Sequence, residues 1–169
     1  MEFQPTNLFN RLKELFPNIN IAFIMSFTTQ LLQGVAHLHS RDICHLDLKL
    51  DNILLQQGPE LKFKLIDFEY AGKLGEIDEQ TIRHNWKDRT LLYMPPEVIR
   101  MVKKINKNKS IECWRKIDWK KVDVFSLGVT LFTVIFYTSP FASDKASSKD
   151  EHYKYIKENR LEEFWSIND

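Results

Sequence analysis

The stretch His45-Leu46-Asp47-Leu48-Lys49-Leu50-Asp51-Asn52, followed at once by Ile53-Leu54-Leu55, organises the rest of this chain. It brings an acid, a base and an amide together between a helical pattern and a strand pattern, where functional side chains often lie. An Asp can accept the proton of an attacking hydroxyl, and a Lys two residues later can neutralise a transferring phosphoryl group. An Asn five residues after the Asp can offer its amide oxygen to Mg²⁺. The stretch therefore predicts a phosphoryl-transfer site with Asp47 and Lys49 as catalytic residues.

Two apolar runs after this stretch predict a β-hairpin. Ile53–Leu55 and Leu61–Ile66 flank Gly58-Pro59, which marks a turn, and the second run alternates with the period of a strand. The hairpin would hold Asn52 at one root and Asp67 at the other, so that two oxygen ligands can meet at one Mg²⁺. The alternative interpretation makes these polar residues ordinary turn residues. Their combination with the preceding stretch favours the metal site.

Four motifs, in order along the chain, resemble those of the eukaryotic protein kinases. The family's His-Arg-Asp-Leu-x-x-x-Asn loop is similar to residues 45–52, its Asp-Phe-Gly motif to Asp67-Phe68-Glu69, and its Ala-Pro-Glu motif to Pro95-Pro96-Glu97. Asp123-Val124-Phe125-Ser126-Leu127-Gly128 resembles the family's Asp-x-Trp-Ser-x-Gly helix start. These motifs span nearly the whole chain, and their order makes the resemblance specific.

The resemblance implies an α+β, protein-kinase-like fold, of which only part is present. The 44 residues before His45 contain neither a Gly-x-Gly-x-x-Gly loop nor a Val-Ala-Ile-Lys-like strand. We therefore expect a mainly helical carboxy-terminal lobe, with a small β-hairpin that carries the metal-binding residues and without the amino-terminal lobe. A chain of 169 residues, 43% of them hydrophobic, can bury one core. The partial domain over residues 1–169 would comprise a catalytic loop (45–52), an activation segment (67–97), an insertion (about 98–122) and a central helix (about 123–137).

The resemblance also implies roles for the polar side chains. Asp47 would orient and deprotonate the acceptor hydroxyl, and Lys49 would offset charge on the γ-phosphate of ATP. Asn52 and Asp67 would hold Mg²⁺ across the phosphates, so that Lys49, Asn52 and Asp67 bind the cofactors ATP and Mg²⁺. Lys49 and Thr90 match the serine/threonine kinases of the family, which makes the expected partners ATP and a protein substrate with a Ser or Thr acceptor. Asp123 would hold the catalytic loop through its backbone.

Three residues depart from the family pattern. Leu46 replaces the Arg that, in much of the family, grips a phosphate on the activation segment, so we expect activity without such a phosphate. Glu69 replaces a Gly, which removes a permissive backbone position and adds a carboxylate beside the metal site. Arg89 stands where the family has Gly before Thr90.

Two other functions remain open at this point. A lobe that lacks half of the nucleotide cleft could serve as a non-catalytic binding module. Residues 66–72 also resemble the metal loop of choline and aminoglycoside kinases, which would indicate a small-molecule kinase. Those enzymes lack the Pro-Pro-Glu motif and the Asp-x-x-Ser-x-Gly helix, so this alternative ranks below the others.

Composition narrows the classes of partner and compartment. The formal net charge of +1 gives no electrostatic reason to expect nucleic acid or a membrane. The two cysteines, Cys44 and Cys113, form no close pair, which favours a reducing compartment. The start of the chain has no apolar core of a signal peptide. We expect an intracellular, cytoplasmic protein, and the sequence carries no sign of its oligomeric state.

Hydrophobic spacing predicts the remaining elements. Helices are expected over residues 6–16 and from Asn18 or Asn20 to about Ser40. The polar middle of the activation segment, residues 72–88, reads as a mobile loop, and the lysine-rich residues 103–109 read as a solvated loop. Asp123 is expected to cap an apolar, buried helix. His37 and His39 lie two residues apart, which favours a structural role over zinc.

Overall fold

The computed structural model describes residues 6–9, 14, 19–56, 60–86 and 89–167. Its elements, in chain order, are β1 (Thr6–Asn7), α2 (Ile21–His39), β2 (Ile43–Cys44), the 3₁₀ turn η2 (Leu50–Asn52), β3 (Ile53–Gln56), β4 (Lys62–Leu65), β5 (Gly72–Lys73), α3 (Glu79–Asn85), α4 (Pro96–Ile105), the 3₁₀ turn η3 (Glu112–Lys116), α5 (Trp119–Phe136), α6 (Glu151–Lys157) and α7 (Leu161–Ile167). This mainly helical α+β arrangement with short strands confirms the predicted fold class.

Helix α2 begins and ends as the sequence predicts. The side chain of Asn20 accepts a hydrogen bond from the backbone N–H of Phe23 at 2.9 Å, which caps the first turn, and the helix ends at Ser40. Its core-facing side chains repeat every four residues, and the buried ones are Phe23, Phe27, Leu31 and Val35. By length and composition alone α2 could also cross a membrane, the one such helix in the described part of the chain. Its four buried side chains belong to the same core cluster as Leu127 and Val134 of α5.

The predicted hairpin is present. Strands β3 and β4 pair antiparallel, with Ile53 opposite Leu65 and Gln56 opposite Lys62. The ring of Phe63 on β4 packs edge-on against those of Phe23 and Phe27, at centroid distances of 5.4 and 4.9 Å. The hairpin is therefore fixed to α2 through aromatic contacts that bury its inner face.

The start of the predicted helix over residues 6–16 is wrong. Thr6 and Asn7 form β1, because their backbone pairs antiparallel with Leu55 and Leu54 of β3. Leu8, Phe9 and Glu14 are helical as predicted, and the rest of that segment lies outside the described residues. Sheet pairing with a strand almost fifty residues away overrides the local helical spacing here.

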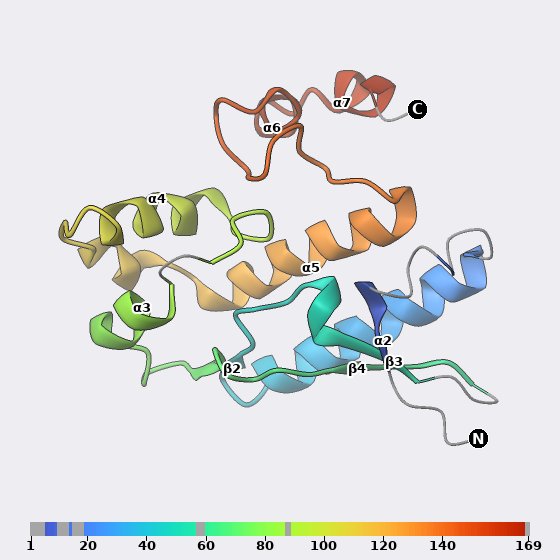
Figure 1. Ribbon diagram of the computed structural model, residues 1–169, viewed down its shortest axis with the longest axis horizontal. Helices are drawn as coiled ribbons and strands as arrows, with labels where there is room; N and C mark the ends of the chain where they lie inside the picture. The colour runs from blue at the N-terminus through green and yellow to red at the C-terminus, as the bar shows by residue number, and fades with distance from the viewer. Residues whose placement is uncertain (1–5, 10–13, 15–18, 57–59, 87–88, 168–169) are drawn as a thin grey trace.

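Helix α5 runs through the middle of the molecule (Figure 1) and starts earlier than predicted. Its cap is Asp118, whose side chain accepts from the backbone N–H of Lys121, and Asp123 lies inside the helix. The expectation that the helix is buried on all sides also fails, since Val124 is 58% exposed. Val129 and Val134 nevertheless belong to different core clusters, so α5 connects the two halves of the core.

Two expected loops contain regular structure. Residues 72–88 include β5, which pairs with β2, and α3, which is capped by Asp78 and anchored by the buried side chain of Ile82. The lysine-rich run begins inside α4, where Lys103 and Lys104 occupy the last turn. Their positive charges interact favourably with the negative end of the helix dipole. The buried face of α4 explains why this part of the insertion is a helix: Val98, Ile99, Met101, Val102 and Ile105 all face the core.

Candidate active site

One carboxylate on α5 holds the catalytic loop in place through hydrogen bonds. Asp123, fully buried, accepts hydrogen bonds from the backbone N–H groups of His45 and Leu46, each at 2.8 Å. These bonds tie the two residues that precede Asp47 to the central helix. This is the structural support that the resemblance implied for Asp123.

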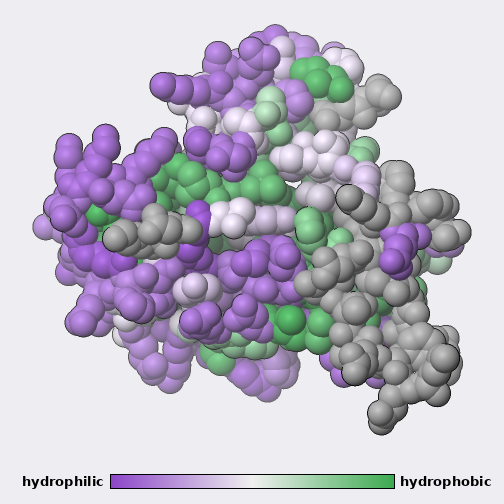
Figure 2. Space-filling view, viewed as in Figure 1, coloured by the Kyte–Doolittle hydropathy of each residue, from purple (hydrophilic) through white to green (hydrophobic). Residues whose placement is uncertain are grey.

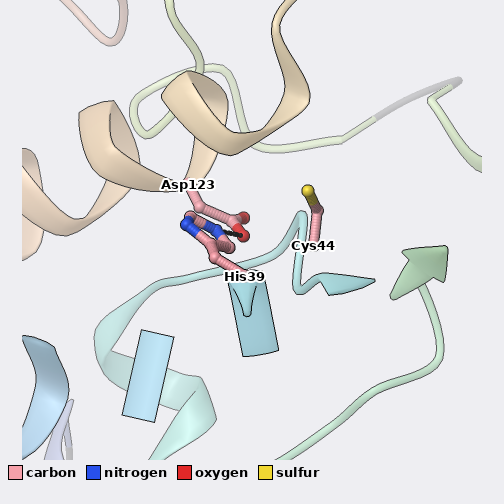
Figure 3. A group of neighbouring side chains, drawn as sticks. All are labelled: His39, Cys44 and Asp123. Atoms are coloured by element: carbon pink, nitrogen blue, oxygen red, sulfur yellow. Dashed lines mark hydrogen bonds and ion pairs between the residues drawn. The ribbon is translucent and has the colours of Figure 1, made fainter. Parts of the chain in front are cut away.

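His39 and Cys44 complete a cluster around the same carboxylate (Figure 3). The ligand atoms of His39, Cys44 and Asp123 lie within 4.8 Å of one another, a grouping that the sequence analysis missed because it joins distant segments. His39 Nε2 lies 2.8 Å from Asp123 Oδ2, and both carboxylate oxygens already hold the backbone of the loop. Burial, followed by the charge of Asp123, raises the pKa of the Cys44 thiol to about 12. A neutral thiol and an occupied carboxylate favour a structural role for this cluster over a metal site.

His45 is a buried packing residue. Its Nε2 donates to the carbonyl of Ile66 at 3.1 Å, its Nδ1 lies 3.3 Å from the backbone nitrogen of Asp47, and its ring lies 4.8 Å from that of Phe68. Burial lowers the pKa of His45 below its ordinary value, against the opposing charge of Asp123. The imidazole therefore stays neutral and links the catalytic loop to the strand that leads to Asp67.

Asp47, Lys49 and Asn52 come together as the sequence predicts. Lys49 Nζ donates to Asp47 Oδ2 at 2.8 Å, and Asn52 Nδ2 donates to the same oxygen at 2.7 Å and to the Asp47 carbonyl at 2.9 Å. The short turn η2 folds the chain back between these residues, which makes the contacts local. Asn52 thus holds Asp47 through its amide nitrogen, and its amide oxygen remains as a possible cation ligand.

Asp67 lies at the opposite root of the hairpin. The backbone N–H of Ile66 donates to the Asn52 carbonyl at 3.0 Å, so the hairpin register brings the chain at residue 67 next to Asn52. The Asp67 side chain is exposed, and its φ of +62° turns the chain sharply away from β4. A carboxylate and an amide oxygen form a hard donor set, so the residues at the two roots fit Mg²⁺.

Glu69 does not occupy a backbone conformation that requires glycine. The described residues with positive φ include Leu46 and Asp67, whereas Glu69 is not among them. The replacement of the family's Gly is therefore accommodated without strain at this position. Both side chains are exposed, and the backbone N–H of Glu69 donates to Asp67 Oδ1 at 3.4 Å.

Arg89 makes the contact that the sequence analysis did not predict. Its Nη2 donates to Asp47 Oδ1 at 2.5 Å and to the Leu46 carbonyl at 2.8 Å. Its guanidinium carbon lies 4.1 Å from the ring centroid of Tyr70 and 4.5 Å from that of Trp86. Only 8% of the Arg89 side chain is exposed. Its position just before Thr90, a residue that matches the serine/threonine kinases, was the one available signal.

The charge of Asp47 is stabilised from two sides. Burial favours its neutral form, but the hydrogen bond from Lys49 and the charge and hydrogen bond of Arg89 outweigh this effect and lower its pKa below the ordinary value. Asp47 is therefore an ionised carboxylate that is 12% exposed. A negatively charged acceptor held among positive groups can bind a hydroxyl proton or a basic partner.

Comparison with known proteins agrees with this geometry. The family model for the protein kinase domain matches residues 1–167. The human serine/threonine-protein kinase ULK3 is 35% identical over 135 residues, and the match covers 80% of this chain and 24% of ULK3. The Arabidopsis thaliana serine/threonine-protein kinase SRK2J is 34% identical over 122 residues, with 70% and 30% covered. This chain therefore spans about a quarter to a third of these relatives.

A solved structure supports the same family. The crystal structure of the Rad53 kinase domain and SCD2 matches with a TM-score of 0.58 and 25% sequence identity, over 94% of this chain and 48% of that chain. The protein-kinase-like fold is thereby confirmed, and the protein kinase match favours a protein kinase over the small-molecule kinases. With a family model that covers nearly all of its residues, the chain belongs to the protein kinase domain family.

Proposed function

We propose that this chain is the carboxy-terminal lobe of a serine/threonine protein kinase, which transfers the γ-phosphate of ATP to a hydroxyl of a protein substrate. The observation that carries the proposal is the contact of Asp47 with both Lys49 and Asn52, at 2.8 and 2.7 Å. The serine/threonine kinases among the relatives support the acceptor class. Two free cysteines, Cys44 and Cys113, support an intracellular location.

The lobe assignment has its own support. The match to the Rad53 kinase domain structure uses 94% of this chain but 48% of the other. The described residues before the catalytic loop form a short strand pair with β3 and the core helix α2. Most of the described residues before the loop therefore lie in a helix, and the sequence before His45 has no Val-Ala-Ile-Lys-like strand for an ATP-binding lysine.

The residues of the site would perform the reaction by positioning and electrostatics. When bound, ATP and Mg²⁺ supply the γ-phosphoryl group and a divalent charge close to it. Asp47 orients the acceptor hydroxyl and takes its proton, since it is ionised and held in place by Asn52. Lys49 offers positive charge next to Asp47, where the phosphoryl group would approach. Asn52 Oδ1 and the Asp67 carboxylate would hold the metal.

A thermal unfolding scan with and without Mg²⁺ and ATP tests nucleotide binding. When the free nucleotide concentration is a hundred times the dissociation constant, binding adds about 2.7 kcal/mol to the free energy of unfolding. For a domain of this size we expect the midpoint to rise by roughly 5–10 °C. The rise should require Mg²⁺ and disappear in Asp67→Ala. The control is Asp42→Ala, which removes a carboxylate that pairs with Lys120 at the surface. A midpoint that stays unchanged in the wild-type chain would contradict nucleotide binding by this lobe.

A non-catalytic binding module is the second candidate. The observation that favours it is the ion pair between Arg89 and Asp47, which engages the proposed base. A module of this kind would bind its protein partner without phosphoryl transfer. A radiolabelled-phosphate transfer assay on the chain separates the two candidates, because the kinase should label a peptide and lose this activity in Asp47→Asn.

A further inference from the structure

Arg89 lies between Asp47 and a pocket on the surface. The pocket has a volume of about 610 Å³, and Arg89 and Thr90 line it together with apolar side chains of the following segment and of α4. Figure 2 shows hydrophobic side chains gathered beside α4, within a mostly hydrophilic surface. A peptide whose hydroxyl reaches Asp47 would place a neighbouring side chain at this pocket. Arg89 therefore touches both the proposed base and the place of the adjacent substrate residue.

The acceptor hydroxyl and Arg89 compete for the same oxygen. Asp47 Oδ2 already accepts from Lys49 and Asn52, and Oδ1 accepts from Arg89 Nη2. A base must come within hydrogen-bonding distance of the proton that it removes, about 2.6–3.2 Å between heavy atoms. With the guanidinium in place, access to the Asp47 carboxylate is restricted. Arg89 holds one of the two acceptor positions of Oδ1, so an acceptor hydroxyl gains freer access to this oxygen when Arg89 moves away.

An anionic side chain in the pocket could draw Arg89 away. Arg89 Nη1 is buried and has no hydrogen-bond partner among the described residues, so the guanidinium can make further hydrogen bonds. A carboxylate can take two parallel bonds from a guanidinium, which replaces what Arg89 loses at Asp47. Lys103 adds a second positive charge at the pocket. The carboxylate of the pocket, Asp144, is already paired with Lys145 at 2.8 Å.

We propose that Arg89 makes this site select acceptor peptides that carry a carboxylate side chain next to the Ser or Thr. The carboxylate binds the Arg89 guanidinium, and this exchange frees Asp47 Oδ1 for the acceptor hydroxyl. Arg89 thereby acts as a specificity-determining residue that couples substrate recognition to the release of the base. The proposal rests on the proposed kinase function, because it needs Asp47 as the group that receives the hydroxyl.

The test compares two labelled peptides that differ in one side chain, Asp or its neutral isostere Asn, directly after the acceptor Ser. Fluorescence anisotropy measures their binding to the 169-residue chain in the presence of Mg²⁺ and ADP, so that the acceptor Ser is not phosphorylated during the measurement. We expect the Asp peptide to bind the wild-type chain about tenfold more tightly, as for one charge-assisted hydrogen bond. Arg89→Gln should lose most of this preference, because Lys103 is then the remaining cation among the residues that line the pocket. Arg83→Gln, which removes an arginine paired with Glu79 in the same segment, should keep the preference.

Several results would overturn the proposal. They are equal binding of the two peptides to the wild-type chain, binding of neither peptide, and a preference that is undiminished in Arg89→Gln. If Arg89→Gln does not melt cooperatively, Arg89→Lys takes its place, because it keeps the charge and loses the planar fork. An unchanged preference in Arg89→Lys would then contradict the proposal.

A second readout follows Arg89 itself. In ¹⁵N-labelled chain, the guanidinium signals of Arg89, assigned by their loss in Arg89→Gln, should shift with the Asp peptide and stay in place with the Asn peptide. The proposed function is judged separately by phosphate transfer. An Arg89-dependent preference without phosphate transfer would support recognition of the peptide carboxylate by Arg89 and contradict the kinase activity. Transfer without the preference would support the kinase activity and contradict that recognition.

Discussion

The carboxylate of Asp123 accepts a hydrogen bond from the backbone N–H of Leu46, a residue whose φ is +62°. Left-handed backbone is costly for a side chain such as leucine, and it persists only where the surroundings enforce it. Asp123 lies in the middle of the core and comes from α5, so the helix enforces this turn. This bend of the backbone directs Asp47 toward Lys49 and Asn52. The helix therefore determines the shape of the catalytic loop although it contributes no reacting group.

Replacing Asp123 by alanine should destabilise the protein strongly. The change leaves the N–H groups of His45 and Leu46 and the ring of His39 without their buried acceptor. We expect a loss of about 3–5 kcal/mol in the free energy of unfolding, which lowers the melting midpoint by roughly 10 °C. Circular dichroism melts measure this. Asp118→Ala on the same helix should cost only about 1 kcal/mol, the value of a helix cap. Equal losses in both variants would contradict the role of Asp123.

Asp47→Asn should abolish phosphate transfer and leave the fold intact. The amide keeps an oxygen for Arg89, whereas alanine would leave a buried guanidinium without its partner. Loss of the base should lower transfer at least about a hundredfold, while the rise of the melting midpoint with Mg²⁺ and ATP persists. The matched control is Asp42→Asn, since Asp42 is 65% exposed and pairs with Lys120. Undiminished transfer by Asp47→Asn would remove Asp47 from its proposed role.

Phosphatase treatment should change neither transfer nor stability. Leu46 is 6% exposed and packs in the core, so it cannot hold a phosphate on the activation segment. Arg89 instead attaches that segment to the loop through the Leu46 carbonyl, a bond that does not involve the proposed base. Transfer rates and melting midpoints should match those obtained with heat-inactivated phosphatase. A tenfold fall in transfer after active phosphatase would show that an activating phosphate is needed.

The protein should lose stability on mild acidification because of His45. Burial lowers its folded-state pKa below the ordinary value of 6.5. As the pH falls below that value, the unfolded chain binds a proton that the folded chain refuses, so the free energy of unfolding decreases. The stabilisation that comes from a neutral His45 is fully present above pH 6.5. It is lost as the pH falls through the lower folded-state pKa. Urea unfolding at pH 7.5 and 5.5 measures the change.

His45→Gln isolates this effect, since its side chain does not titrate. The variant should be less stable at pH 7.5, because it loses the hydrogen bond to Ile66 and the contact with Phe68. It should also show a smaller decrease between the two pH values than the wild-type chain. The remaining histidines are common to both proteins. Identical pH dependence would mean that His45 does not contribute.

Short-range features of the sequence were sufficient for much of the fold and for part of the site. Asn20 caps α2 through a bond to the residue three positions later, and the alternating residues of β4 pair with β3 as a hairpin. Asp47, Lys49 and Asn52 meet because they lie within five positions of one another and η2 folds the chain between them. Each of these depends on neighbouring residues alone.

Long-range packing decided the rest. The bond from Arg89 to Asp47 spans 42 residues, and that between His39 and Asp123 spans 84. The first requires the activation segment to fold against the catalytic loop, and the second requires α5 to pack beside the end of α2. Local spacing cannot reveal either. The helix α3 and the strand β1 likewise form in segments with weak or contrary local patterns. The sequence by itself determined which groups are available for phosphoryl transfer. The tertiary structure decided that Arg89 pairs with the Asp47 carboxylate, because only packing brings these two charges together.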